Sequence, residues 1–100
     1  MDMRKYDFTK SNVDKSPAEA GVYILYAGET IIYIGRAQGG STTIRSRLQR
    51  HESGAEGSCT QKATAYSRTV TDDSVNLEVE LLEWHETSYG KLPRCNSRIG

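Results

Sequence analysis

The sequence of 100 residues lacks an apolar run long enough to cross a bilayer, which takes about 20 consecutive apolar residues. Its first residues also lack the apolar core of a secretory signal peptide. The two cysteines, Cys59 and Cys95, stand too far apart for the paired spacing of a metal-binding motif. We therefore expect a cytoplasmic protein without membrane contact, in which reducing conditions keep both cysteines as free thiols.

An excess of charge is also missing, because 13 basic and 13 acidic side chains give a formal net charge of zero. The charges are nevertheless separated along the chain. Residues 31–51 contain four arginines and no acid, whereas residues 71–90 contain six acids and neither lysine nor arginine. A basic patch on a neutral protein can follow a phosphate backbone, so the composition does not exclude DNA as a partner.

The sequence does contain short segments with the character of strands. Two β-prone runs at 22–26 and 31–34 flank a polar turn that carries Gly28, which predicts an antiparallel hairpin. A third strand is expected within 62–70. Residues 1–15 show no clear periodicity, and we interpret them as a lead-in segment that packs through its aromatic side chains. One hundred residues are enough for one domain, residues 1–100, with a modest core.

A first helix is predicted directly after the hairpin. Ser41 or Thr42 can cap it, and it is expected to run to about Glu52. Arg47 and His51 are four residues apart and share one face at the border of the buried stripe. Taken alone, this segment is better explained as a solvated basic helix with an incidental histidine.

A second helix is predicted from about residue 75 to 89, with Gly90 as the residue that ends it. Steps of about 100° per residue place Glu80 and Glu83 on the polar face and Glu78 inside a broad apolar arc. A carboxylate that faces a core is costly unless a cation meets it. That cation is either a metal ion or an arginine from the first helix.

Each strand of the predicted hairpin places a tyrosine next to a glycine at its outer end. Gly21 and Tyr23 lie on the first strand, and Tyr33 and Gly35 lie on the second. The hairpin brings these ends together, and glycine there lets a ligand or another backbone approach closely. For an arbitrary hairpin, tyrosines that merely pack in the core are the simpler interpretation.

Five segments together resemble the GIY-YIG nuclease family. The paired signature corresponds to Gly21-Val22-Tyr23 and Tyr33-Ile34-Gly35, followed by the basic Arg36. Residues 47–51 resemble the Arg-Leu-x-x-His stretch of the family, and residues 78–82 resemble its Glu-x-x-Leu-Leu stretch. Residues 90–96 resemble its closing segment, in which an asparagine completes the site.

The resemblance implies an α+β fold in which a small three-stranded antiparallel sheet is flanked by helices. It also implies a metal-dependent DNA endonuclease that hydrolyses phosphodiester bonds with Mg²⁺ or Mn²⁺. One active site per chain predicts nicking of single strands. The apolar stripes are about what one small core consumes, so we expect a monomer or at most a weak homodimer.

The resemblance assigns roles to ten residues. Tyr23 is the candidate general base, with a pKa lowered by arginines and metal, and Glu78 is the metal ligand, with Glu86 as the alternative. Asn96 is expected to fix the position of Tyr23 or of a loop. The implied catalytic residues are Tyr23, Tyr33, Arg47, His51, Glu78 and Asn96, and the implied phosphate or DNA contacts are Gly35, Arg36, Arg45 and Arg50.

Two other classes of function remain open from the sequence. The chain fits an inactive nucleic-acid-binding module, or a subunit of a larger repair, restriction or mobile-element nuclease. It also fits a small domain used for protein contacts, although that interpretation leaves Glu78 on the apolar face unexplained.

Overall fold

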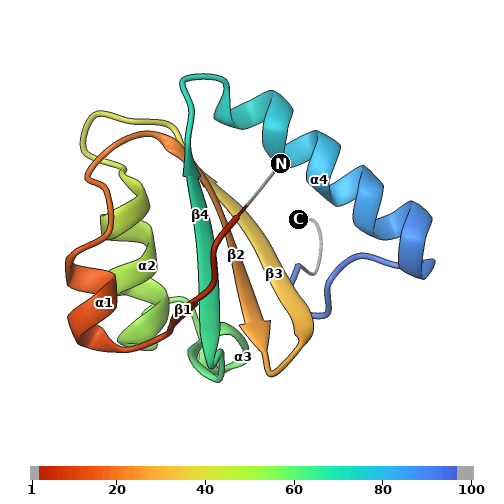
Figure 1. Cartoon of the computed structure of the whole chain (residues 1–100), viewed down its shortest axis with the longest axis horizontal. Coiled ribbons are helices and arrows are strands. Elements are labelled where there is room, and N and C mark those ends of the chain that lie inside the picture. The colour runs from red at the N-terminus through yellow and green to blue at the C-terminus, as the bar shows by residue number, and fades with distance from the viewer. Residues whose placement is uncertain (1–2, 97–100) are drawn as a thin grey trace.

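A four-stranded antiparallel sheet lies between two layers of helices in the computed structural model, which describes residues 3–96 (Figure 1). The strands are β1 (Tyr6–Asp7), β2 (Gly21–Ala27), β3 (Thr30–Ala37) and β4 (Ala65–Val70). Their order is β1-β4-β2-β3, and every neighbouring pair is antiparallel. The predicted α+β architecture is confirmed, with four strands instead of three.

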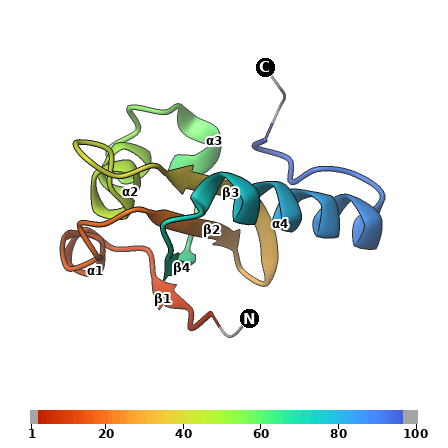
Figure 2. The same cartoon turned by 90° about the horizontal axis from the view of Figure 1, so that it is seen from above.

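Helices cover both faces of this sheet. They are α1 (Lys10–Asp14), α2 (Ile44–Glu52), α3 (Ser58–Gln61) and α4 (Ser74–Tyr89). Figures 1 and 2 show α1 and α2 together on one face and α4 on the opposite face, while the short α3 lies beside α2. No helix within the described part of the chain is long and apolar enough to span a bilayer.

The fourth strand comes from the segment that was expected to be a lead-in. Strand β1 pairs with β4 through Tyr6 and Tyr66, whose rings stack 5.6 Å apart, and Phe8 meets Tyr66 edge-on at 5.9 Å. The expected packing through aromatic side chains is therefore present. A strand of two residues is too short to show an alternating pattern, which is why the sequence did not predict it.

The predicted hairpin forms one side of the sheet, with β2 inside it and β3 at its edge. Strands β2 and β3 are joined by a turn at Gly28, whose φ of 63° lies in the left-handed region that glycine adopts without strain. All residues from Gly21 to Leu25 are buried. Helices on both faces explain this, and they also explain why the run is continuously apolar instead of alternating.

Capping residues near in sequence set the ends of α2 and α4, and only the start of α2 differs from the prediction. Helix α2 begins after Thr43, whose hydroxyl accepts from the backbone N–H of Ser46, while the Ser46 hydroxyl accepts from the Thr43 N–H at 2.9 Å. This capping box places the cap after the predicted Ser41 or Thr42. Helix α4 ends as predicted at Gly90, which is left-handed with φ 79°.

Helix α4 buries less of its apolar surface than expected. Val75, Val79, Trp84 and Tyr89 are 42–59% exposed, although they belong to the predicted apolar arc. An arc that broad is wider than the strip of helix that a sheet can cover. The expectation that one core consumes all apolar stripes is therefore wrong for α4.

The two cysteines form a disulfide, so the prediction of free thiols is wrong. Cys59 lies in α3 and Cys95 in the closing segment, with their Cα atoms 5.8 Å apart. The closing segment reaches this position by running along the edge of β3, where the Cys95 N–H donates to the Ile32 carbonyl at 2.9 Å. A separation of 36 residues gives no local signal for this pairing.

Matched truncations on the two helix layers test this distribution of the core. Leu48 of α2 has no exposed surface, so Leu48→Ala should lower the free energy of unfolding by about 2–5 kcal/mol. Val79 of α4 is 46% exposed, so Val79→Ala should change it by about 0.5 kcal/mol or less. Urea unfolding followed by circular dichroism measures both, and equal losses would contradict the described exposure of α4.

Candidate active site

The hydroxyl of Tyr23 lies at the meeting point of the hairpin and α2. It is 2.9 Å from Nε2 of His51, and Nε of Arg47 donates to it at 3.4 Å. One helical turn separates Arg47 from His51, so both side chains reach the same phenol from one face of α2. On the far side of the imidazole, Nδ1 of His51 lies 2.8 Å from Oγ1 of Thr60 in α3.

The hydrogen bonds around this phenol assign its proton. The Tyr23 oxygen already accepts from Arg47, and its own O–H needs an acceptor because the side chain is fully buried. Nε2 of His51 is the acceptor in reach. The imidazole therefore carries its proton on Nδ1 and donates it to the Thr60 hydroxyl.

Burial sets the protonation of both rings. Loss of solvation raises the pKa of Tyr23 well above its ordinary value, and the nearby Arg47 only partly opposes this. Loss of solvation, with a smaller contribution from Arg47, lowers the pKa of His51 from 6.5 to about 4. At neutral pH the pair is thus a neutral phenol and a neutral imidazole, so the arginines alone do not bring the Tyr23 pKa below its ordinary value as expected.

Gly35 makes room for the tyrosine rings. A Cβ on it would lie 2.6 Å from Cζ and from the hydroxyl of Tyr23 and 2.7 Å from Cε2 of Tyr33. Similarly, a Cβ on Gly21 would collide with the Thr69 carbonyl and with Ile44. The glycines therefore permit side-chain and strand packing, and the expectation that Gly35 contacts a phosphate does not fit its buried position.

Next to this cluster lies an open pocket of about 300 Å³. It is lined by Tyr33, Arg36, Gln38, Thr42, Arg47 and Glu78. Residues from β3, the loop after it, α2 and α4 thus converge on one space, and four of the ten predicted site residues are among them. Tyr23 does not line it and has no exposed surface. Tyr33 is therefore the phenol that faces the pocket.

Glu78 enters the pocket as an ion pair. Its Oε1 lies 2.6 Å from Nη1 of Arg36, and its side chain is 15% exposed. Nε of Arg36 is buried and has no hydrogen-bond partner within residues 3–96. Glu86 is exposed and does not line the pocket, so the structure favours Glu78 of the two candidate carboxylates.

Asn96 completes the edge of β3. Its Oδ1 accepts from the Ile34 N–H and its Nδ2 donates to the Ile34 carbonyl, both at 2.9 Å. Ile34 lies between Tyr33 and Gly35, so this amide fixes the strand that carries the pocket's phenol. Asn96 thus has a positioning contact, but the contact is with β3 and not with Tyr23 or a loop.

Comparisons with known proteins relate this arrangement to a fold. No family model and no curated protein sequence matches the chain. The chain is similar in structure to the GIY-YIG N-terminal endonuclease domain of UvrC from Thermotoga maritima bound to magnesium, with a TM-score of 0.67 and 22% identity over 87% of this chain and 93% of that one. A tyrosine-to-phenylalanine variant of the same domain matches with a TM-score of 0.67 and 22% identity, over 89% of this chain and 94% of that one. An asparagine-to-alanine variant matches with a TM-score of 0.67 and 21% identity over the same shares of the two chains.

The chain has the GIY-YIG fold. The two triplets that name this fold are the outer ends of β2 and β3, where Tyr23 is paired with Gly35 across the hairpin. Their residues serve mainly to pack the two phenols over one glycine. The open pocket begins where that packing ends.

Two of the arginines expected to contact DNA are engaged elsewhere in the chain. Nε of Arg45 donates to the Ser16 carbonyl at 2.7 Å, which ties α2 to the turn before β2. Arg50 pairs with Glu56 at 2.5 Å, and the hydrogen bond from Arg50 lowers the pKa of that carboxyl. Neither arginine lines the pocket.

Several site residues had no signal in the sequence. Thr60, the partner of His51, was missed because the residues around it are polar and show no periodicity, although they form the short helix α3. Gln38 and Thr42 lie in the loop after β3 and become pocket residues only through the fold. Glu56 lies 3.5 Å from Nη1 of Arg47. Because it is only five residues beyond His51, the sequence could have indicated that this acid contacts the arginines of α2.

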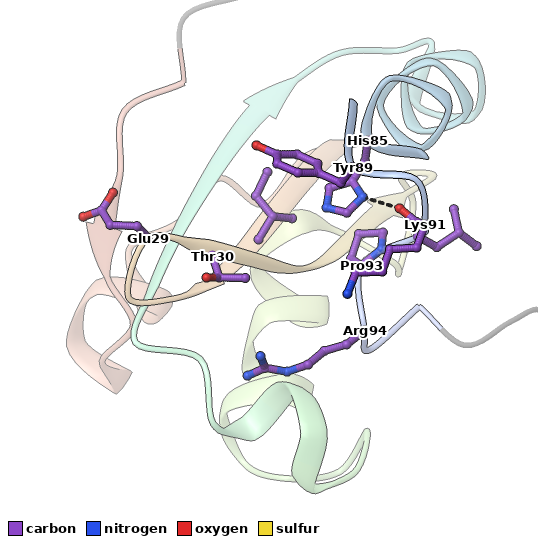
Figure 3. Close-up of a pocket in the computed structure, with 9 residues that line it drawn as sticks. Glu29, Thr30, His85, Tyr89, Lys91, Pro93 and Arg94 are labelled. Atoms are coloured by element: carbon purple, nitrogen blue, oxygen red, sulfur yellow. Dashed lines mark hydrogen bonds between the residues drawn. The ribbon is translucent and has the colours of Figure 1, made fainter. Parts of the chain in front are cut away.

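A second pocket of about 220 Å³ lies at the far end of α4, beside the hairpin turn (Figure 3). Figure 3 shows His85 and Tyr89 of α4 next to each other above the segment of Pro93, with the His85 ring 4.6 Å from that of Tyr89. Nδ1 of His85 donates to the Lys91 carbonyl at 2.7 Å. His85 therefore secures the turn after α4.

The burial of His51 predicts a pH dependence of stability. Its pKa is about 4 in the folded chain and about 6.5 when unfolded, so the unfolded state binds more protons between these values. The contribution of His51 to the free energy of unfolding should be complete above pH 6.5, and the free energy of unfolding should fall by up to about 3 kcal/mol as the pH drops to 4. Urea unfolding across this range measures it. His51→Gln should flatten this part of the profile, and an unchanged profile would contradict the assignment.

Proposed function

We propose that the protein is a divalent-metal-dependent endonuclease that hydrolyses phosphodiester bonds of DNA and nicks one strand at a time. The observation that carries the proposal is the pocket in which Tyr33, Arg47 and Glu78 meet. A phenol, a guanidinium and a carboxylate are the groups needed to handle a proton, a phosphate and a cation. The similar Thermotoga maritima domain, which shares the GIY-YIG fold, is an endonuclease domain bound to its catalytic divalent cation.

The donor set of the pocket fits Mg²⁺ or Mn²⁺. Within residues 3–96 no group of three or more His, Cys, Asp or Glu side chains could hold a metal, so the pocket supplies one carboxylate. Mg²⁺ commonly takes one or two carboxylates and fills its remaining positions with water and substrate phosphate. Glu78 would hold the ion, with one of its oxygens shared with Arg36. When bound, such an ion polarises the phosphate and neutralises developing charge.

The protein side chains account for the other requirements. Arg47 faces the pocket, and a guanidinium there stabilises the negative charge that builds on phosphate oxygens. Tyr33 lines the same pocket, and in this proposal its phenol orients the attacking water and takes its proton. Tyr23 and His51 act one layer deeper, because their hydrogen bonds hold the Arg47 side chain in place.

Incubation of supercoiled plasmid with the protein and Mg²⁺ or Mn²⁺ tests the function, with EDTA as the control. Among the described residues, the pocket with Glu78 holds the groups for one displacement, so nicked circles should appear first and linear DNA later. DNA binding in a mobility-shift assay without any cleavage would favour the inactive binding module. Linear product without a nicked intermediate would contradict nicking by single sites.

Substitutions along α4 test the metal ligand. Glu78→Gln should abolish Mg²⁺-dependent nicking and Mg²⁺ binding measured by calorimetry, because it removes the only carboxylate among the described residues of the pocket. Glu80→Gln and Glu83→Gln are matched controls on the exposed face and should retain both. Retained activity in Glu78→Gln would rule out its role.

A matched pair of tyrosine variants tests which phenol handles the proton. Tyr33→Phe should lower the nicking rate by ~10²–10⁴-fold while DNA affinity and stability are retained, as expected for loss of a general base. Tyr23→Phe should instead cost about 1–3 kcal/mol of stability, because it leaves buried polar groups without their partner.

Single-turnover nicking, filter binding and urea unfolding distinguish the two variants. If Tyr33→Phe nicks at the wild-type rate while Tyr23→Phe is inactive but fully stable, Tyr23 is the base and the assignment to Tyr33 is wrong.

A further inference from the structure

The disulfide joins two segments that each hold a different part of the pocket. Cys59 directly precedes Thr60, whose hydroxyl lies 2.8 Å from Nδ1 of His51. Cys95 directly precedes Asn96, whose amide makes two hydrogen bonds of 2.9 Å with the backbone of Ile34. One covalent bond therefore lies next to both positioning contacts.

We propose that the Cys59–Cys95 disulfide is a thiol–disulfide exchange site that switches the pocket. In the oxidised protein it holds Thr60 against His51 and Asn96 against β3, and its reduction by a dithiol releases both contacts. The proposal rests on the proposed nuclease function for its effect on activity. Its structural part, the release of Asn96 from β3, is measured without any substrate.

The segment around Cys59 has little else to hold it. Thr60 is the one buried residue in the stretch 53–62. Helix α3 has four residues and lacks a side-chain cap, because Gly57 precedes it. The other contacts are mostly at the surface: Glu56 pairs with Arg50 and Arg47, and Nε2 of Gln61 donates to the Glu52 carbonyl at 3.4 Å. Exposed contacts of this kind contribute little. The disulfide thus adds a covalent link directly beside Thr60, the residue that meets the imidazole.

The segment around Cys95 is held by a few contacts along β3. The Cys95 N–H donates to the Ile32 carbonyl, and the Asn96 side chain bonds to Ile34. Pro93 is buried at its start. These are hydrogen bonds at the edge of a sheet, where water competes for the same backbone groups once the segment is free to move.

The exchange needs only a dithiol and is balanced. Cys59 is exposed and Cys95 is half-buried, so a thiolate of the dithiol attacks Sγ of Cys59 and the Cys95 thiolate leaves and takes up a proton. The second thiol of the reductant then attacks its own sulfur in the mixed disulfide and releases Cys59. Two electrons and two protons pass to the protein, and the dithiol becomes a disulfide.

Release of the two segments should affect catalysis more than DNA binding. Without Thr60, Nδ1 of His51 loses its acceptor, and the tautomer that accepts from Tyr23 is no longer fixed. Arg36 and Arg47 stay on β3 and α2, where they can still meet phosphate. We therefore expect the nicking rate to fall by about 10–100-fold on reduction, as for a small misplacement of reacting groups, with less than about threefold change in DNA affinity.

Amide hydrogen exchange of the wild-type protein, with and without dithiothreitol, is the deciding measurement. Thiol titration confirms complete reduction. The Ile34 amide, whose acceptor is Asn96, should exchange at least about tenfold faster in the reduced protein, while the Ile24 amide in central β2 stays protected. Unchanged exchange at Ile34 overturns the proposal, and equal acceleration at Ile24 also overturns it, because that result means global unfolding.

Nicking assays test the effect on activity. The double variant Cys59→Ser/Cys95→Ser should have the low rate of the reduced protein and should not respond to dithiothreitol. With the disulfide intact, Thr60→Val should also lower the rate, and Thr60→Ser should restore it because the hydroxyl returns.

A reduced wild type that nicks at the full rate overturns the switch. Absence of nicking in the oxidised protein contradicts the proposed nuclease function instead, and the exchange at Ile34 still decides the structural part.

Discussion

The hydrogen bond from Tyr23 to His51 is the contact on which the arrangement of the pocket depends. It lies in the interior, where both groups have lost water, so neither can leave the other without an unpaired polar atom. Through it β2 is linked to α2, and through Thr60 the link extends to α3. Arg47 donates to the same oxygen, so the guanidinium that faces the pocket is held by a buried phenol.

The neutral state of this pair is consistent with its position behind the pocket. A buried imidazolium next to Arg47 would place two positive charges together, and a buried phenolate would need full solvation that it does not have. Charge is instead concentrated at the rim, where Arg36 and Glu78 face each other. In the proposed nuclease, a bound cation would pair with Glu78 and a bound phosphate would pair with Arg36. Each residue would thus exchange its partner in the ion pair for a new counter-charge.

The features that the sequence predicted are those that depend on neighbouring residues. The hairpin follows from two β-prone runs around Gly28, the end of α4 follows from Gly90, and the inward phase of Glu78 follows from helical steps. These properties are determined by residues close in sequence, and the structure has each of them as predicted.

The features that the sequence did not predict depend on contacts between distant segments. Tyr23 and Tyr33 look equivalent in the sequence, and only the placement of α2 and α3 buries one and leaves the other at the pocket. The disulfide and the fourth strand likewise join residues that are far apart along the chain. The exposed valines of α4 show a further limit, because an apolar pattern on a helix does not indicate how much apolar surface the sheet will cover.

The amide of Asn96 also has a consequence for assembly. An edge strand with free N–H and C=O groups invites another chain to add a strand, either as a ligand or in aggregation. Here the outward groups of Ile34 and the carbonyl of Ile32 are already occupied by the protein's own closing segment, and the opposite edge is a strand of two residues. Strand addition is thereby disfavoured along the middle of β3, whereas the apolar side chains exposed on α4 offer a second chain a surface that needs no strand pairing.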